Sequence, residues 1–198
     1  MIEFGAVILA AGVSSRMGEF KPLLQIGGET MISRVVTMMR CAGVEHVVVV
    51  TGYRGVDVEE RLKDEKIIFV HNEQFRKTQM FDSLLCGLGA IGDKCRKILI
   101  SPADVPLVRP ETVKAVLSCH GKFVRPVYRA EPGHPVLLSA KIIHTLEQYV
   151  GTGGLRGAME SSGFGIVEME TDDIGVILDC DTKEDYYCLL RYFNARKP

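Results

Sequence analysis

An apolar run followed directly by a small, cationic loop lies near the start of this chain, where residues 6–24 read AVILAAGVSSRMGEFKPLL. The run from Ala6 to Ala10 shows no polar alternation, which is typical of a strand covered on both faces of a parallel sheet. The residues that follow are small, so backbone N–H groups there can approach phosphate oxygens. Arg16 can bind a phosphate with two hydrogen bonds, and Lys21 adds a point charge. The stretch therefore predicts a buried strand that leads into a phosphate-binding loop.

This loop differs from two common nucleotide-binding fingerprints. A Walker loop requires GxxxxGK[ST], whereas the interval from Gly12 to Gly18 is longer and Lys21 precedes a proline. The dinucleotide pattern GxGxxG is not matched either. A glycine turn with solvated charges would explain Arg16 alone or Lys21 alone, but it explains poorly why both follow a buried strand. We interpret the loop as a triphosphate site.

Similar buried runs alternate with segments of helical spacing along residues 1–121. Further strands are expected at His46–Thr51, Ile67–His71 and Ile98–Ser101. Apolar residues recur at helical spacing within 32–39 and 81–88, and Pro110 suits the first turn of another helix. This alternation predicts a three-layer α/β/α, Rossmann-like fold around a mostly parallel central sheet.

The pattern changes after residue 121 to shorter apolar runs interrupted by Pro and Gly. Further strands are expected at Phe123–Val127, His134–Leu138, Phe164–Met169 and Gly175–Leu178. The Thr-x-x-Asp pattern at Thr182 is a start signal for a helix, which we expect to cover the sheet. We interpret residues 1–198 as one domain, with a nucleotide-binding half (1–121), an added subregion (122–178) and a closing segment (179–198).

Composition narrows the class of protein further. The 198 residues include 24 Lys and Arg against 25 Asp and Glu, so the basic excess of a nucleic-acid-binding protein is absent. The longest apolar runs fall far short of the ~20 residues of a membrane helix. Glu3 stands where a signal peptide would carry basic residues, so we expect a cytoplasmic protein without a membrane partner. The six cysteines show no CxxC spacing, which favours reduced core thiols over zinc or disulfides.

The loop closely resembles the signature LAAGxSSRMGxxKxLL of the nucleotidyltransferases related to molybdenum cofactor guanylyl- and cytidylyltransferases. The likeness continues nearly throughout the chain, through Val50–Gly55, Asp104–Pro106, Pro132–Leu137 and Asp179–Asp185. The pair Ala10–Ala11 and the PGHP segment are similar to the cytidylyltransferase branch, whereas guanylyltransferases usually carry a more glycine-rich loop. The resemblance implies a nucleotidyltransferase fold, CTP or another NTP as donor, and a molybdopterin-type acceptor.

The resemblance also implies roles for single residues. Nucleotide binding falls to Leu9, Ala10, Ala11, Gly12, Ser14, Ser15, Arg16, Lys21 and Ser83. Arg16, Lys21 and Asp104 take the catalytic roles. For Ser83 the alternative is a hydroxyl bonded to its own helix. Gln79 replaces a family glycine and removes backbone freedom at a turn near the nucleotide.

Two carboxylates are candidate ligands for Mg²⁺. Asp104 follows a buried run, at the carboxyl end of a strand, where open α/β sheets bind their ligands. Oxygen ligands beside a triphosphate suit Mg²⁺. Resemblance to a DxDTPED pattern favours Asp181 as the second ligand, although an aspartate there could instead cap the following helix. In an extended segment Asp179 and Asp181 would share one face, and we rank Asp181 first.

The acceptor is expected to bind the subregion 122–178. The flanking prolines and glycine of PGHP fix a turn that presents His134, and the resemblance implies contact of this residue with the acceptor. Arg156 matches the arginine of a GDxGAR-type loop, in which Thr152 replaces the aspartate. A flexible loop with one surface arginine is the alternative explanation.

The predicted reaction is in-line attack of a terminal phosphate of molybdopterin on the α-phosphate of CTP, with release of pyrophosphate. Mg²⁺ on Asp104 and Asp181 would bridge phosphate oxygens, while Arg16 and Lys21 offset charge on the leaving group. One alternative keeps this chemistry but uses a sugar phosphate or alditol phosphate as acceptor. Another alternative is a non-catalytic molybdenum cofactor carrier or insertion partner. Its best support is Gln79 in place of the family glycine. If the protein is either a molybdopterin nucleotidyltransferase or a molybdenum cofactor carrier, a recipient molybdoenzyme is a further partner to expect.

Overall fold

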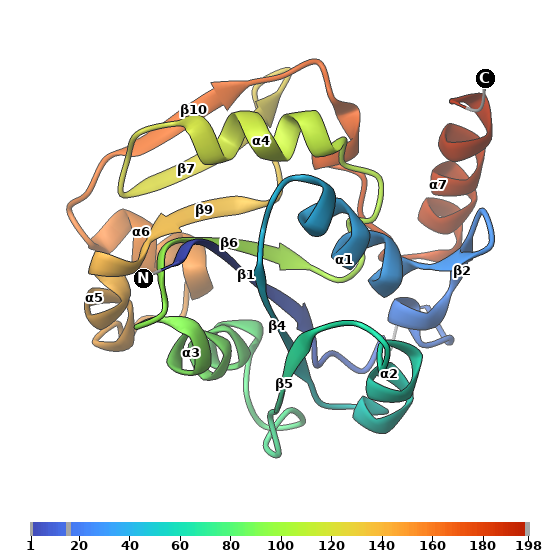
Figure 1. Cartoon of the computed structure of the whole chain (residues 1–198), viewed down its shortest axis with the longest axis horizontal. Coiled ribbons are helices and arrows are strands. Elements are labelled where there is room, and N and C mark those ends of the chain that lie inside the picture. Colours follow the sequence, from blue (N-terminus) through green and yellow to red (C-terminus); the bar gives the residue numbers. More distant parts are fainter. Residues whose placement is uncertain (1, 15–16, 197–198) are drawn as a thin grey trace.

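The computed structural model describes residues 2–14 and 17–196 of the chain. Its main sheet has the order β10-β7-β9-β6-β1-β4-β5, with β8 paired to β7 (Figure 1). The strands are β1 (Ile2–Ala10), β4 (His46–Thr51), β5 (Ile67–His71), β6 (Cys95–Pro102), β7 (Phe123–Tyr128), β8 (Glu131–Pro132), β9 (Val136–Ser139) and β10 (Ile166–Glu170). Strands β5, β4, β1 and β6 pair in parallel, as do β7 and β10, whereas β9 runs antiparallel to both β6 and β7. The expectation of a mostly parallel central sheet is confirmed.

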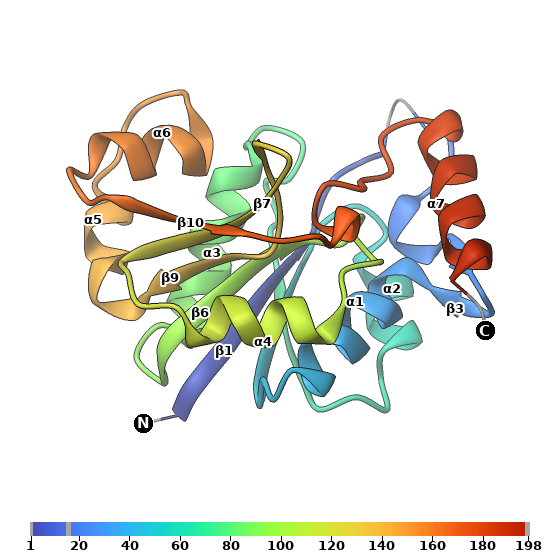
Figure 2. The same cartoon turned by 90° about the horizontal axis from the view of Figure 1, so that it is seen from above.

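Helices cover both faces of this sheet (Figure 2). They are α1 (Met31–Cys41), α2 (Gly55–Arg61), α3 (Met80–Ile91), α4 (Pro110–Ser118), α5 (Ile143–Glu147), α6 (Gly154–Ser161) and α7 (Lys183–Ala195). Two buried apolar clusters follow from the alternation of β1: Ala6 and Ile8 pack with α1, α2 and α4, while Val7 packs with α3, α5 and α6. The central sheet therefore lies between two helical layers, and the predicted three-layer architecture is confirmed.

Several local signals have the predicted effect. Pro110 occupies the first turn of α4. Thr182 caps α7 in a reciprocal box with Asp185. Gly87 sets the distance of α3 from the sheet, because an added Cβ there would lie 2.5 Å from Val7 Cγ1 and 2.8 Å from Val50 Cγ2. This glycine, whose packing role the sequence patterns did not predict, thus lets α3 approach β1, the strand that leads into the phosphate loop, and its neighbour β4.

Two local predictions are wrong. Residues 175–178 do not form a strand: the short 3₁₀ helix η3 (Ile174–Val176) begins there, because Asp173 Oδ1 accepts a hydrogen bond of 3.1 Å from the backbone N–H of Gly175. Helix α7 does not cover the main sheet. It packs on the hairpin of β2 (Gln25–Ile26) and β3 (Glu29–Thr30), where the Tyr186 hydroxyl donates to the Gln25 carbonyl at 2.7 Å. Figure 1 shows α7 at one edge of the molecule, beside β2.

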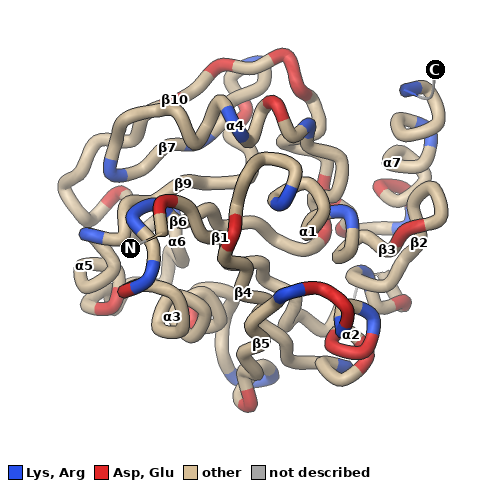
Figure 3. Tube along the Cα trace, in the orientation of Figure 1, with Lys and Arg blue, Asp and Glu red and all other residues tan. Residues whose placement is uncertain are grey.

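The cysteines and charges complete the description. Only Cys95 and Cys180 of the six cysteines are buried, so the expectation of core thiols holds for these two, while Cys41, Cys86 and Cys188 are exposed. Charges of both signs are interspersed along the trace (Figure 3). Attraction for an anionic ligand must therefore come from local cations rather than from a field of one sign. Among the described residues, no helix is both long and apolar enough to cross a membrane.

Candidate functional site

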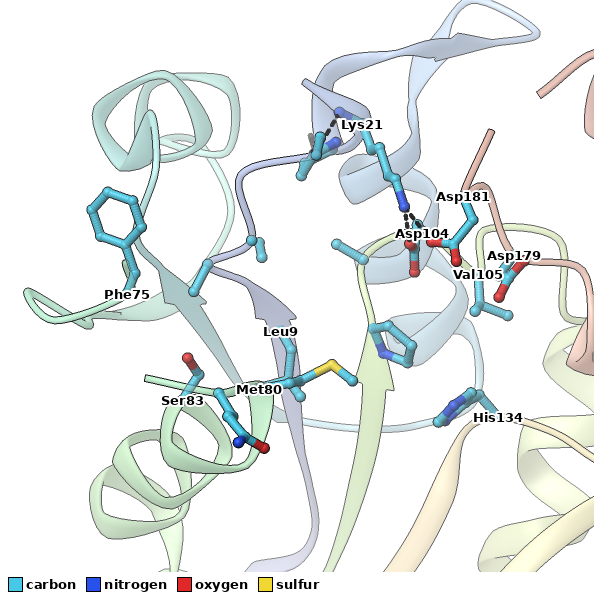
Figure 4. Close-up of a pocket in the computed structure, with 18 of the residues that line it drawn as sticks. Leu9, Lys21, Phe75, Met80, Ser83, Asp104, Val105, His134, Asp179 and Asp181 are labelled. Atoms are coloured by element: carbon cyan, nitrogen blue, oxygen red, sulfur yellow. Dashed lines mark hydrogen bonds and ion pairs between the residues drawn. The ribbon is translucent and has the colours of Figure 1, made fainter. Parts of the chain in front are cut away.

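A pocket of about 410 Å³ opens where β1 and β6 end. Open α/β sheets bind ligands beyond the carboxyl ends of their strands, so the location fits a substrate site. The pocket brings together ten of the residues predicted from sequence, namely Leu9, Ala10, Ala11, Gly12, Ser14, Lys21, Ser83, Asp104, His134 and Asp181. Ser15 and Arg16 lie outside the described residues. Figure 4 shows two groups of side chains, with Phe75 and Ser83 on one side and Lys21, Asp104, Asp179 and Asp181 on the other.

The phosphate loop is tied to its neighbours at both ends. The Ala11 carbonyl accepts a hydrogen bond of 3.3 Å from the Tyr53 N–H, which follows β4. Gly52 permits this approach, because a Cβ there would lie 2.7 Å from the Ala11 oxygen. Farther along, Ser14 Oγ accepts from the backbone N–H of Lys21 at 3.2 Å. The loop therefore holds Lys21 next to the backbone that is predicted to bind phosphate.

Lys21 joins two carboxylates from distant parts of the chain. Its Nζ lies 3.1 Å from Asp104 Oδ2 and 2.6 Å from Asp181 Oδ1. Burial acts to lower the pKa of Lys21, but its hydrogen bonds to Asp181 and Asp104 and their charges outweigh burial, so the pKa is raised. The ammonium therefore stays protonated at neutral pH. The helix-cap alternative for Asp181 is not realised, since Thr182 caps α7.

A third carboxylate, Asp179, lines the same end of the pocket. Its pKa is raised, first by burial and then by the negative charges of Asp104 and Asp181. Cys180 lies between the two aspartates in sequence, and burial raises the pKa of its thiol to about 12, so it remains neutral and unsuited to bind a metal as thiolate. The donors of this end are oxygens, which fit a hard divalent cation such as Mg²⁺.

These carboxylates do not by themselves form a closed metal site. Among the described residues, no three His, Cys, Asp or Glu side chains converge closely enough to hold an ion. Mg²⁺ typically takes one or two carboxylates and completes its shell with substrate phosphates and water. The arrangement around Asp104 and Asp181 therefore fits an ion that is shared with a phosphate ligand.

The opposite end of the pocket is neutral and hydrogen-bonded. Asn72 Nδ2 donates to Ser83 Oγ and to Thr78 Oγ1, both at 2.9 Å, and Asn72 Oδ1 accepts from the Gln74 N–H at 3.0 Å. Ser83 thus accepts a hydrogen bond from the residue after β5. Sequence reasoning missed the role of Asn72. The available signal was its position directly after a predicted buried strand, at the edge where ligands bind.

The backbone at Gln79 does not require a glycine. Its φ of −93° and ψ of 173° are extended, which any residue adopts. It caps α3 in a reciprocal box, in which its N–H donates to Asp82 Oδ2 at 2.7 Å. Gln79 lines the pocket together with Phe75 and Met80, two further residues that sequence reasoning missed. The departure from the family glycine therefore changes the pocket wall rather than straining the turn.

The two predicted acceptor-binding residues lie in different surroundings. His134 lines the pocket, and its buried Nδ1 has no hydrogen-bond partner among the described residues. Burial lowers the pKa of His134, against the opposing effects of Asp104 and the Ile100 backbone, so the imidazole is neutral at pH 7. Arg156 lies in α6 rather than in a loop, with its side chain 81% exposed and paired with Glu160 at 2.9 Å. It is not among the residues that line the pocket.

In this Rossmann-like sheet, the loop after the central strand β1 places Lys21 against Asp104, which follows the neighbouring strand β6, and against Asp181, which precedes α7. Such an arrangement of cation and carboxylates at the ligand-binding edge suits a nucleotidyltransferase. The chain belongs to the family of the MobA-like NTP transferase domain, whose model matches residues 6–166. This match confirms the family resemblance that the loop indicates.

Individual relatives agree with this family. The chain is 26% identical over 190 residues to the molybdenum cofactor cytidylyltransferase of Escherichia coli (strain K12), covering 94% of this chain and 95% of that protein. A nucleotidyl transferase from Methanothermobacter thermautotroptrophicus has a similar structure, with a TM-score of 0.87 and 25% identity over 98% of this chain and 99% of its own. A manganese complex of a protein from Mycobacterium tuberculosis H37Rv has a TM-score of 0.79 at 24% identity, over 96% of this chain and 98% of its own, and shows the same fold.

Proposed function

We propose that this enzyme transfers CMP from CTP to the terminal phosphate of molybdopterin and releases pyrophosphate. The observation that carries the proposal is the meeting of Lys21 with Asp104 and Asp181 beside the phosphate loop. Transfer of a phosphate-containing group depends on positioning and charge stabilisation, which this arrangement can supply. The choice of CTP and molybdopterin is supported by the Escherichia coli relative, which is named a molybdenum cofactor cytidylyltransferase.

In this mechanism the protein positions two anionic substrates for one displacement. Backbone N–H groups from Gly12 onward, together with Lys21 and Arg16, bind the triphosphate. Asp104 and Asp181 would hold Mg²⁺, which would neutralise charge on the reacting phosphates. A new P–O bond forms between the acceptor phosphate and the α-phosphorus, and the bond to pyrophosphate breaks. The acceptor phosphate is already ionised near neutral pH, so His134 positions the acceptor and transfers no proton.

The other end of the pocket is assigned to the nucleoside. Ser83 and Thr78, both held by the buried Asn72 amide, provide neutral hydroxyl groups there, and Phe75 and Met80 provide apolar surface. Hydrogen-bonding groups among apolar side chains suit a base or ribose rather than a phosphate. Because Gln79 replaces the family glycine in this wall, we expect it to influence which base is preferred.

The test measures pyrophosphate release by the purified protein with CTP, molybdopterin and Mg²⁺. We expect release to require all three, to fall when GTP, ATP or UTP replaces CTP, and to be lost in Asp104→Asn. Asp93→Asn is the matched control, because it removes the same charge from an exposed turn. Release that is equally fast with GTP, or that occurs with a sugar or alditol phosphate and not with molybdopterin, would contradict the proposal.

A further inference from the structure

The space between Asp104 and Asp181 is already filled by a cation that belongs to the protein. Lys21 Nζ lies within hydrogen-bond distance of one oxygen of each carboxylate, at 3.1 and 2.6 Å. The lysine side chain is only 12% exposed, so water screens these contacts weakly. The ammonium thus neutralises part of the negative charge that would otherwise attract a divalent ion.

A divalent ion and this ammonium cannot share the two carboxylates without strong repulsion. Mg²⁺ binds carboxylate oxygens at about 2.0–2.1 Å, which would bring it close to Nζ in its observed place. At such a separation, in a partly buried site, like charges repel strongly. Binding of the ion therefore requires Lys21 to move.

Lys21 has another anionic partner available once a triphosphate is bound. Its backbone N–H donates to Ser14 Oγ at 3.2 Å, so the lysine is anchored to the phosphate loop. Gly12, Ser14 and Lys21 line the same pocket, and a Cβ added to Gly12 would meet nothing within 4 Å. The flexible lysine stem can therefore turn its ammonium from the carboxylates to a phosphate in the loop.

We propose that Lys21 excludes divalent cations from Asp104 and Asp181 in the nucleotide-free enzyme and releases these carboxylates when a triphosphate takes its ammonium. The inference rests on the metal-binding role of the two aspartates in the proposed function. It adds an order of events: the ion enters with the nucleotide or after it. Because such coupling is reciprocal, the nucleotide tightens ion binding by the same factor as the ion tightens nucleotide binding.

The experiment measures binding of Mn²⁺ alone to nucleotide-free protein, from the EPR signal of the free ion. Lys21→Met removes the ammonium and keeps a long unbranched side chain. We expect its dissociation constant for Mn²⁺ to be at least about tenfold lower than that of the wild type, because repulsion between like charges is removed. Lys97→Met is the matched control: Lys97 is also partly buried, but its Nζ donates to the carbonyls of Leu117 and Cys119 at 2.7 and 3.1 Å. It should bind Mn²⁺ as the wild type does.

Two further variants make the outcome decisive. Lys21→Gln, which also lacks the charge, should show the same gain and serves where the methionine variant does not fold. Adding Asp104→Asn to either variant should abolish the gain, which assigns it to this site. Affinity equal to the wild type in the folded Lys21 variants, or no Mn²⁺ binding by any of them, would overturn the proposal.

The same titration separates this proposal from the proposed function. Mn²⁺ is measured without nucleotide or acceptor, so the result does not depend on which base or acceptor is used. Repeating the titration with α,β-methylene-CTP should lower the dissociation constant more for the wild type than for Lys21→Met. An enzyme that behaves in this way but releases no pyrophosphate from CTP and molybdopterin would contradict the proposed function alone.

Discussion

The two ends of the pocket are built in opposite ways. At the charged end, Lys21 meets Asp104 and Asp181, which lie 83 and 160 positions away in sequence. At the neutral end, Asn72 meets Thr78 and Ser83, only 6 and 11 positions away. The charged end therefore depends on the complete fold, whereas the neutral end is one local segment closed by directional hydrogen bonds. Under the proposed function, the reacting phosphates therefore lie where distant segments of the chain meet, whereas the nucleoside lies against a single local segment.

The largest expected effect is on the charged end. Asp104→Asn should reduce turnover by at least about 100-fold, because removal of one group that stabilises the transition state typically costs that much. The melting temperature should change little, since Asp104 is 21% exposed and Lys21 keeps Asp181 as a partner. Steady-state kinetics and thermal unfolding measure both quantities. A large loss of stability with little loss of turnover would reverse the roles assigned to the two ends.

At the neutral end, we expect a substitution to affect stability more than turnover. Asn72→Ala leaves the buried Ser83 hydroxyl without its donor and should lower the free energy of unfolding by about 1–3 kcal/mol. We also expect weaker CTP binding, with turnover at saturating CTP reduced less than by Asp104→Asn. Urea unfolding and calorimetric titration with CTP measure these effects. Gln74→Ala, at an exposed position of the same turn, is the control and should change neither quantity appreciably.

A smaller effect concerns the pH dependence of stability. Burial lowers the pKa of His134 in the folded state, so the unfolded chain, with an imidazole pKa near 6.5, takes up a proton more readily. The stability that comes from keeping His134 neutral in the folded state is fully present above about pH 6.5. It is lost as the pH falls below 6.5, by at most about 1.4 kcal/mol per pH unit. His134→Gln should therefore show a shallower loss of stability between pH 7.5 and 5.5. His144→Gln, the same substitution at an exposed histidine, is the control for the exchange of side chains itself.

The smallest expected effect is at Arg156. Its side chain is paired with Glu160 on the surface of α6 and lies outside the pocket lining, so Arg156→Ala should change turnover less than about twofold. The KM for molybdopterin is the more sensitive measurement. A tenfold rise in that KM would mean that the acceptor extends to α6, and the role implied by the family motif would then be retained.

The parts of the fold that sequence predicted are those with strong local signals. The apolar runs of β4 and β5 match the predicted limits. Strand β4 is buried from Val47 to Thr51, and a strand covered on both faces has little freedom in composition. Strand β5 is the partly buried edge of the sheet, and its run of Ile, Phe and Val still gives a strong local signal. The pattern of α7 indicated which face is apolar, but not that this face packs on the hairpin of Gln25–Thr30. Residues 175–178 resemble a strand in composition, yet the Asp173 carboxylate caps a 3₁₀ turn there. The partner of the apolar face is thus decided by distant contacts. The turn is closed locally by Asp173, whose other carboxylate oxygen is held by the Arg109 N–H and the Thr112 hydroxyl, more than 60 positions away.

The residues of the candidate site likewise include some that the sequence identifies and some that it does not. Lys21 and Asp104 could be identified because each follows a predicted buried strand at the edge where ligands bind. Phe75 and Met80 could not, because an aromatic or a methionine near a turn is more often part of the core. The observed contact between Lys21 and Asp181 required three-dimensional information, since no local pattern encodes a pairing across most of the chain.

The distance in sequence between Lys21 and Asp181 also bears on biosynthesis. The phosphate loop leaves the ribosome well before Asp181, which precedes a helix that packs on the hairpin after that loop. Until residue 181 and the helix behind it have emerged, a nascent chain has the loop and Asp104 but lacks the second carboxylate. Under the proposed function, in which Asp181 is the second metal ligand, we therefore expect no nucleotidyl transfer from a chain that stops short of Asp181.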